Sequence, residues 1–88
     1  MNISMRKPGM TSGEQFFRGV IREPDGSGEK VVVGKATMAL AERMATAEAK
    51  RINWDWFVQH CRVDGDGVDQ QVTVIEQWSS LAGHEILE

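Results

Sequence analysis

Three short stretches of the chain carry residue types that can do chemistry. The first is Asp64-Gly65-Asp66-Gly67-Val68-Asp69, in which carboxylates alternate with glycines as they do in calcium-binding loops. The spacing departs from that template, because the sixth position is Asp69 where glycine is needed and the twelfth is Ile75 where a bidentate glutamate is needed. The segment therefore predicts an acidic hairpin loop and no metal site.

The second stretch is His60-Cys61, where a base stands next to a thiol. A cysteine nucleophile needs a base within hydrogen-bond reach, but successive residues of a strand point to opposite faces of the sheet. We therefore expect Cys61 to be a small buried core thiol. Ser79-Ser80 lacks the Gly-x-Ser-x-Gly elbow of serine hydrolases and is more typical of a turn cap. No catalytic residue and no cofactor site is predicted, and we expect a protein that is not an enzyme.

The third stretch, Gly26-Ser27-Gly28-Glu29-Lys30, superficially suggests a phosphate-binding loop. Such a loop needs Gly-x-x-x-x-Gly-Lys-Ser/Thr and leads into a helix, whereas Lys30 is followed by three valines, which favour a strand. The segment is therefore interpreted as a hairpin turn.

The expected elements are two β-hairpins and a helix between them. The segments 15–22 and 30–36 are rich in Val, Ile and Phe and flank one turn-forming cluster. The segments 57–63 and 71–78 flank the other cluster, at Asp64–Asp69. The intervening chain is rich in Ala, Met, Leu and Glu, so the sequence predicts the order β-β-α-β-β: an α+β domain with an antiparallel sheet of about four strands and one long helix on one face.

The predicted helix begins after Thr37 as N-cap and extends to about Trp56. At about 100° per residue, one apolar stripe faces the sheet. It contains Met38, Ala41, Ala45, Ala49, Ile52 and Trp56. Because alanines let a helix approach closely, Gly19 and Gly34 are predicted to lie on the strands opposite them.

A second apolar stripe lies nearly opposite the first. It consists of Leu40, Met44, Ala47 and Trp54. A helix with two apolar faces is normally covered on both, so a protein partner or a second copy of the chain is one interpretation. The alternatives are that the arm or the tail around Leu81 and Ile86 folds over this stripe, or that the helix ends near Arg51 and Trp54 belongs to a turn.

Basic side chains suggest another surface, on the sheet. The strand residues expected to face the helix are Phe17, Ile21, Phe57, Cys61, Val72, Val74 and Trp78. Alternation then puts a set of basic residues on the opposite face, with Phe16 available for stacking. The set consists of Arg18, Arg22, Lys35, His60 and Arg62. Such a face suits phosphates and exposed bases, although it is equally compatible with an ordinary solvated surface.

Length and composition bound the class of protein. The chain has 88 residues, a formal net charge of -3 and 41% hydrophobic side chains, which indicates one small domain. Mild acidity argues against a general nucleic-acid coat protein. The single Cys61, the lack of a charged-then-apolar leader and the lack of a long apolar run predict a cytoplasmic protein without membrane contact.

We expect a flexible N-terminal arm at 1–13, the domain at 14–80 and a C-terminal tail at 81–88, where Leu87-Glu88 look like residues left by a cloning site. No motif carries a family resemblance, although the chain has the general look of small bacterial accessory proteins. The leading functional hypothesis is a non-enzymatic binding protein that acts through protein contacts or as a homodimer, with the second helix stripe as its contact surface. The alternative is a nucleic-acid-binding module that uses the basic set.

Overall fold

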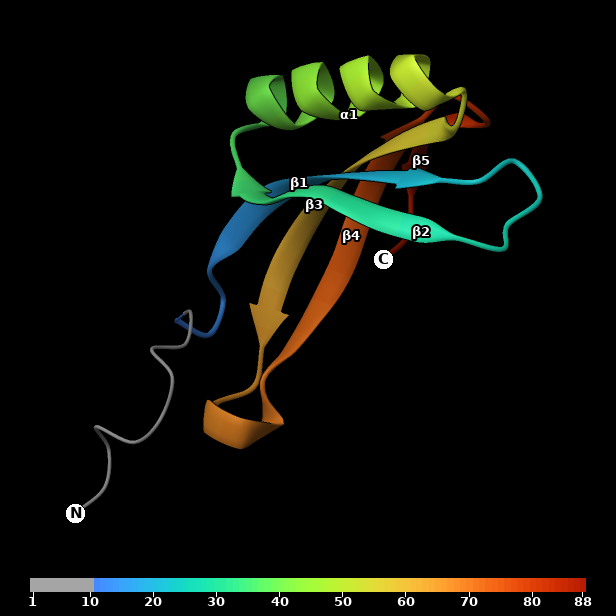
Figure 1. Cartoon of the computed structure of the whole chain (residues 1–88). Helices are drawn as coiled ribbons and strands as arrows, with labels where there is room; N and C mark the ends of the chain where they lie inside the picture. Colours follow the sequence, from blue (N-terminus) through green and yellow to red (C-terminus); the bar gives the residue numbers. More distant parts are fainter. Residues whose placement is uncertain (1–10) are drawn as a thin grey trace.

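One helix lies across a five-stranded antiparallel sheet (Figure 1). The computed structural model describes residues 11–88. The elements are β1 (Gln15–Arg22), β2 (Glu29–Ala36), α1 (Met38–Ile52), β3 (Asp55–Asp64), the short 3-10 turn η2 (Gly67–Asp69), β4 (Gln71–Ser79) and β5 (Gly83–Ile86). The predicted α+β class and the order β-β-α-β-β are confirmed, with one strand more than expected. Most of the predicted arm lies outside the described residues.

The strand order in the sheet is β2-β1-β3-β4-β5. Both β2 and β3 pair with β1 in the antiparallel sense, so β2 and β3 run parallel to each other with β1 between them. The helix connects β2 to β3 and must therefore cross over β1. Within the described part of the chain α1 packs on β1, β2 and β3, whereas its Cα atoms lie more than 8 Å from those of β4 and β5. One helix thus covers three strands of five.

The helix begins and ends at residues whose chemistry suits those positions. The Thr37 side chain accepts a hydrogen bond from the backbone N–H of Leu40 at 3.3 Å, as an N-cap does. Asn53 adopts the left-handed conformation (φ 62°) and ends the helix directly after Ile52. The prediction that the helix reaches Trp56 is therefore wrong. Trp54 follows the cap and Trp56 lies on β3.

Three alanines form the contact between helix and sheet. Ala41, Ala45 and Ala49 are buried, which confirms the centre of the predicted inward stripe, whereas Met38 at its start is exposed. Gly19 of β1 lies directly below: a methyl group built on it would stand 2.8 Å from the Ala41 carbonyl oxygen and 3.2 Å from the Ala45 methyl. A methyl group on Gly34, by contrast, would meet nothing within 4 Å, so its predicted place under the helix is wrong.

The register of the sheet corrects the predicted inward side chains. Gly19 faces the helix and pairs with Val58, so Val58 also faces the helix. Phe57 and Cys61, which alternate with Val58 along β3, point to the other face, where we did not expect them. On β4, Val72 and Val74 share that other face while Trp78 lies on the helix side, because an irregularity at Ile75 shifts the alternation. Only Phe17, Ile21 and Trp78 are oriented as predicted.

Both faces of the central strands are buried. Ile21 and Val58 lie beneath the helix, while Phe16, Cys61 and Val63 form a cluster on the other face. The strands bend strongly below the helix, as Figure 1 shows for β1 and β3. No described helix is long and apolar enough to cross a membrane.

Candidate binding surfaces

The outer side of α1 carries most of the second apolar stripe. Met44 is 36% exposed, Ala47 is exposed and Leu40 is half-buried. We call these three residues the outer stripe. The fourth predicted member, Trp54, is not on the helix. It lies half-buried in a shallow cavity of about 300 Å³ between the helix end and the loop that joins β1 to β2.

Charges border the outer stripe unevenly. Glu48 contacts Lys30 of β2 at 3.4 Å and Arg51 at 2.6 Å, so this flank of the helix lies on the β2 side. The hydrogen bond from Arg51, with a smaller contribution from Lys30, lowers the pKa of Glu48 to about 2. Arg43 and Lys50 border the stripe on its other side and make no ion pair with a described residue. The surroundings of the stripe are therefore basic.

The helix leaves a strip of its own sheet face uncovered. Val58, which faces the helix, pairs with Trp78 of β4, and Trp78 pairs with His84 of β5. The Trp78 and His84 rings therefore lie on the face that bears the helix. Glu76 and Ile86 form the next pair on the same face, and Ile86 is 66% exposed. Since α1 does not reach β4 or β5, these four residues form what we call the open strip.

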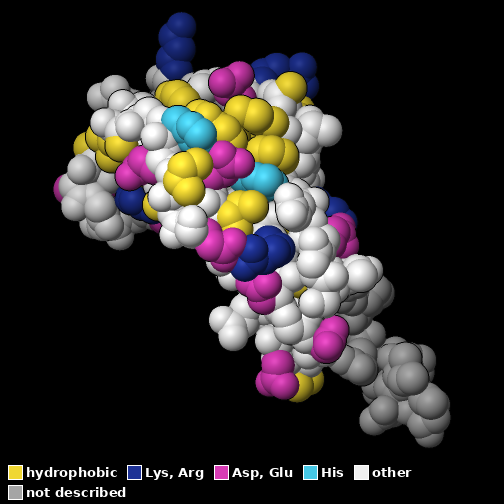
Figure 2. Space-filling model, turned by 180° about the vertical axis from the view of Figure 1, so that it is seen from behind, with side chains coloured by type: hydrophobic (Ala, Val, Ile, Leu, Met, Phe, Trp, Pro, Cys, Tyr) yellow, Lys and Arg dark blue, Asp and Glu magenta, His cyan; other side chains and the backbone are white. Residues whose placement is uncertain are grey.

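Stacked rings continue the open strip toward β1. His84 stacks on Trp78 with ring centroids 4.7 Å apart, and His60 stacks on Phe17 at 4.5 Å. Glu76 lies between the two histidines and contacts each at 2.8 Å. The hydrogen bond with His60, and to a smaller extent the one with His84, lowers the pKa of Glu76. Figure 2 shows both histidines at the surface, with an acidic side chain between them and hydrophobic side chains around them.

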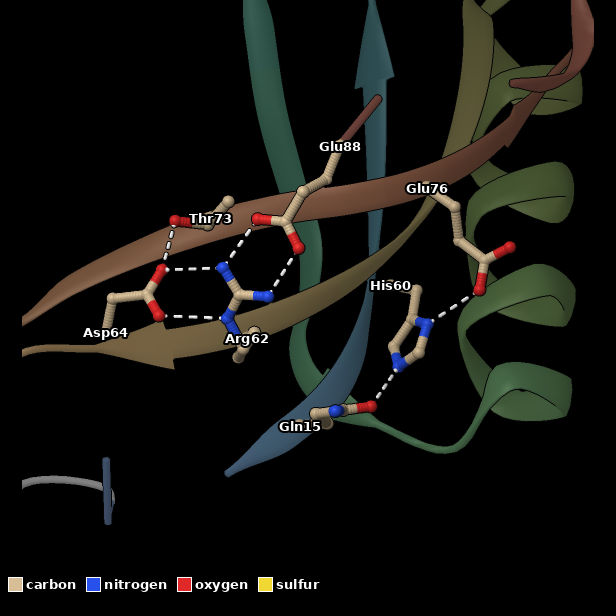
Figure 3. A network of polar contacts seen from close by, with 7 residues as sticks. All are labelled: Gln15, His60, Arg62, Asp64, Thr73, Glu76 and Glu88. Carbon is tan, nitrogen blue, oxygen red and sulfur yellow. Dashed lines mark hydrogen bonds and ion pairs between the residues drawn. The ribbon is translucent and has the colours of Figure 1, made fainter. Parts of the chain in front are cut away.

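A polar network adjoins the open strip (Figure 3). The Arg62 guanidinium donates to both carboxylate oxygens of Asp64 and to Glu88, and the Thr73 hydroxyl donates to Asp64. The Glu88 and Asp64 carboxylates raise the pKa of Arg62. With Glu76, the strip and the adjoining network hold three carboxylates against one guanidinium, so their formal charge is negative when the histidines are neutral.

The structure does not bring the predicted basic set together on one face. Arg18 pairs with Gln59 and therefore points away from the helix, as Arg22 does, whereas His60 and Arg62 are on the helix side. The partners of His60 and Arg62 are described above, and the other three basic side chains have partners as well. Arg18 bonds to Gln59 at 2.7 Å, Arg22 to Glu29 at 3.0 Å and Lys35 to Glu14 at 2.6 Å. Phe16, which we expected to stack on bases, is buried.

The described residues bring no nucleophile and base together around Cys61. Its thiol is fully buried and burial raises its pKa, so the prediction of a core thiol is confirmed. His60 points to the opposite face, as expected. Ser79 accepts a hydrogen bond from the Ala82 backbone and thus caps the turn before β5. Within residues 11–88, no cluster of three or more His, Cys, Asp or Glu side chains suits a metal ion.

Sequence reasoning missed the open strip, because its members lie on two strands of which one was not predicted. The signal that was available is the turn Ser79-Ser80-Leu81-Ala82-Gly83, which separates Trp78 from His84 and makes them a cross-strand pair. Comparison with known proteins adds no candidate function: no protein-family model, no curated protein and no solved structure matches this chain.

Proposed function

We propose that this chain is a small non-enzymatic binding protein, an accessory protein that acts through protein–protein contacts, including contacts with itself. The observation that carries the proposal is the outer stripe of α1. Its Met44 and Ala47 are exposed on a helix whose opposite side is already buried against the sheet. Exposed apolar side chains gathered on one helix face are typical of contact surfaces.

The surroundings of Cys61 support the rest of the proposal. A free thiol that is buried, with its pKa raised by burial, is a packing residue and not a nucleophile. A single free cysteine also suits a reducing compartment, so we propose that the protein acts in the cytoplasm. The geometry of residues 11–88 offers no observation in favour of nucleic-acid binding, which stays a prediction from the sequence.

Photo-crosslinking from the outer stripe tests the proposal. A photoreactive amino acid replaces Ala47, which is exposed and carries no polar contact. We expect a crosslink either to a second copy or to another protein, and we expect Met44→Glu to abolish it, because a buried carboxylate opposes the contact. The matched control is Val68→Glu, which adds the same charge at a loop position that is 94% exposed. A crosslink pattern that Met44→Glu leaves unchanged, or no crosslink at all, would refute the proposal.

A further inference from the structure

The outer stripe and the open strip are complementary surfaces that a single chain cannot bring into contact. Both lie on the helix-bearing side of the sheet: the stripe on top of α1, the strip beside it on β4 and β5. From this arrangement we infer that the occupant of the open strip is the helix of a second copy, in a two-fold dimer. The inference rests on the proposed function and names the partner.

The dimensions of the fold match this arrangement. Two strands at about 4.8 Å spacing make a strip roughly 10 Å wide, which is the diameter of one helix. The helix of the first copy lies over β1, and the middle of the strip, between β4 and β5, is two and a half positions along the sheet, so a helix on the strip lies about 12 Å from it. Packed helices need 8–10 Å, so the strip leaves room for a second helix beside the first.

In a two-fold dimer the outer stripe and the open strip of each copy are both buried against the partner. Each helix keeps its alanine side on its own sheet and turns its outer stripe to the partner's open strip. The helix of 15 residues is about 22 Å long, but β4 and β5 pair over only four residues, which is about 13 Å. Two contacts of this length and about 10 Å width cover roughly 260 Å² of projected area on each copy. Side chains around the two surfaces must supply the rest of the ~800 Å² of accessible surface per partner in a stable complex.

Charge favours the same pairing. Arg43 and Lys50 border the outer stripe and make no ion pair with a described residue, whereas Glu76 lies in the open strip with Asp64 beside it. If the outer stripes of two copies met, the basic side chains beside them would repel each other. If the open strips of two copies met, their carboxylates would repel each other. Only stripe on strip opposes unlike charges at both contacts.

Sedimentation equilibrium with two variants tests this dimer. We expect the wild-type mass to approach twice 9.8 kDa as concentration rises. Met44→Glu puts a carboxylate against the acidic strip and Ile86→Lys puts an ammonium against the basic stripe, so each alone weakens dimerisation by roughly 100-fold. Because both sites are exposed, both variants should fold, which circular dichroism and thermal melting verify. Val68→Glu and Val68→Lys, on the exposed loop, are the charge-matched controls and should dimerise as the wild type does.

Mixing the two variants identifies the mode of contact. In a mixed dimer one contact is wild-type and the other opposes a glutamate to a lysine, so the mixture should dimerise at least ~10-fold more tightly than either variant alone. A dimer that tolerates Ile86→Lys is a stripe-on-stripe dimer, and a dimer that tolerates Met44→Glu does not use the stripe. Either result overturns the inference, as does a wild-type monomer. A monomer that still crosslinks to another protein from Ala47 would overturn the dimer and leave the proposed function intact.

Discussion

Gly19 tests the close approach of α1 to β1. In Gly19→Ala, the added methyl group would lie 2.8 Å from the Ala41 carbonyl oxygen, 3.2 Å from the Ala45 methyl and 3.3 Å from a methyl group of Val33. Ordinary van der Waals contacts begin at 3.4 Å, and the nearest atom belongs to the backbone and cannot rotate away. The helix must therefore move, and overpacking of this kind costs about 1–3 kcal/mol.

Gly34 is the matched control for this substitution. It lies on β2, where an added methyl group meets nothing within 4 Å. Alanine at such a position lowers the entropy of the unfolded chain, so Gly34→Ala should leave stability unchanged or raise it by about 0.5–1 kcal/mol. The two substitutions are chemically identical and differ only in what lies above the strand.

Urea denaturation followed by tryptophan fluorescence measures the difference. With a slope of about 1 kcal/mol per M for a domain of this size, Gly19→Ala should lower the midpoint by roughly 1–3 M. The melting temperature should fall by about 4–8 °C for each kcal/mol. If Gly19→Ala were as stable as Gly34→Ala, the close packing of the alanine stripe on β1 would be refuted, and with it the position of the helix over three strands.

Three further outcomes follow from individual side chains. Thr37→Ala removes the N-cap and should destabilise the fold by about 1 kcal/mol in thermal melting; an unchanged melting temperature would show that this cap contributes nothing. Glu48, whose pKa the Arg51 contact lowers to about 2, stabilises the folded state fully above its unfolded pKa of about 4.5. That contribution is lost as pH falls from 4.5 toward 2, so Glu48→Gln should flatten the stability profile in this window, whereas Glu42→Gln, at a helix position without an ion pair to a described residue, should flatten it less. Cys61, fully buried, should not react with a thiol reagent at pH 8 in the folded protein and should react once per chain in urea; rapid labelling of the native state would contradict its place in the core.

The sequence predicts where a helix or strand begins or ends when a single residue type, such as a turn glycine or a capping hydroxyl, determines that position. The turn between β1 and β2 follows from its glycines, and Gly26 does adopt positive φ. The N-cap at Thr37 likewise follows from its hydroxyl. The helix end was missed because Asn53 is a weaker stop signal than glycine, although asparagine also tolerates the left-handed conformation.

The orientation of β3 could not be predicted from alternation. Phe57 and Val58 are both buried although they point to opposite faces, because the helix covers one face and the Arg22 guanidinium lies over the Phe57 ring on the other, 4.2 Å from its centroid. On β3 the apolar Phe57, Cys61 and Val63 alternate with the polar His60 and Arg62. The helix covers the face that bears the polar pair, where Val58 lies beneath it, so alternation of polarity points to the wrong side. The neighbouring strand β1 determines the orientation of β3. Gly19 must face the helix alanines, and Val58, which pairs with Gly19, therefore faces the helix too.

The two candidate contact surfaces differ in how far the sequence predicts them. The outer stripe depends only on the helix period, so the spacing of Leu40, Met44 and Ala47 is enough to recognise it. The open strip depends on strand order, which brings Trp78 and Ile86 beside the helix without placing them under it. A helix that covers three strands of five leaves room for one more helix, and the exposed stripe on α1 supplies an apolar face that basic side chains border. The two surfaces together therefore make a more specific case for self-association than either does alone.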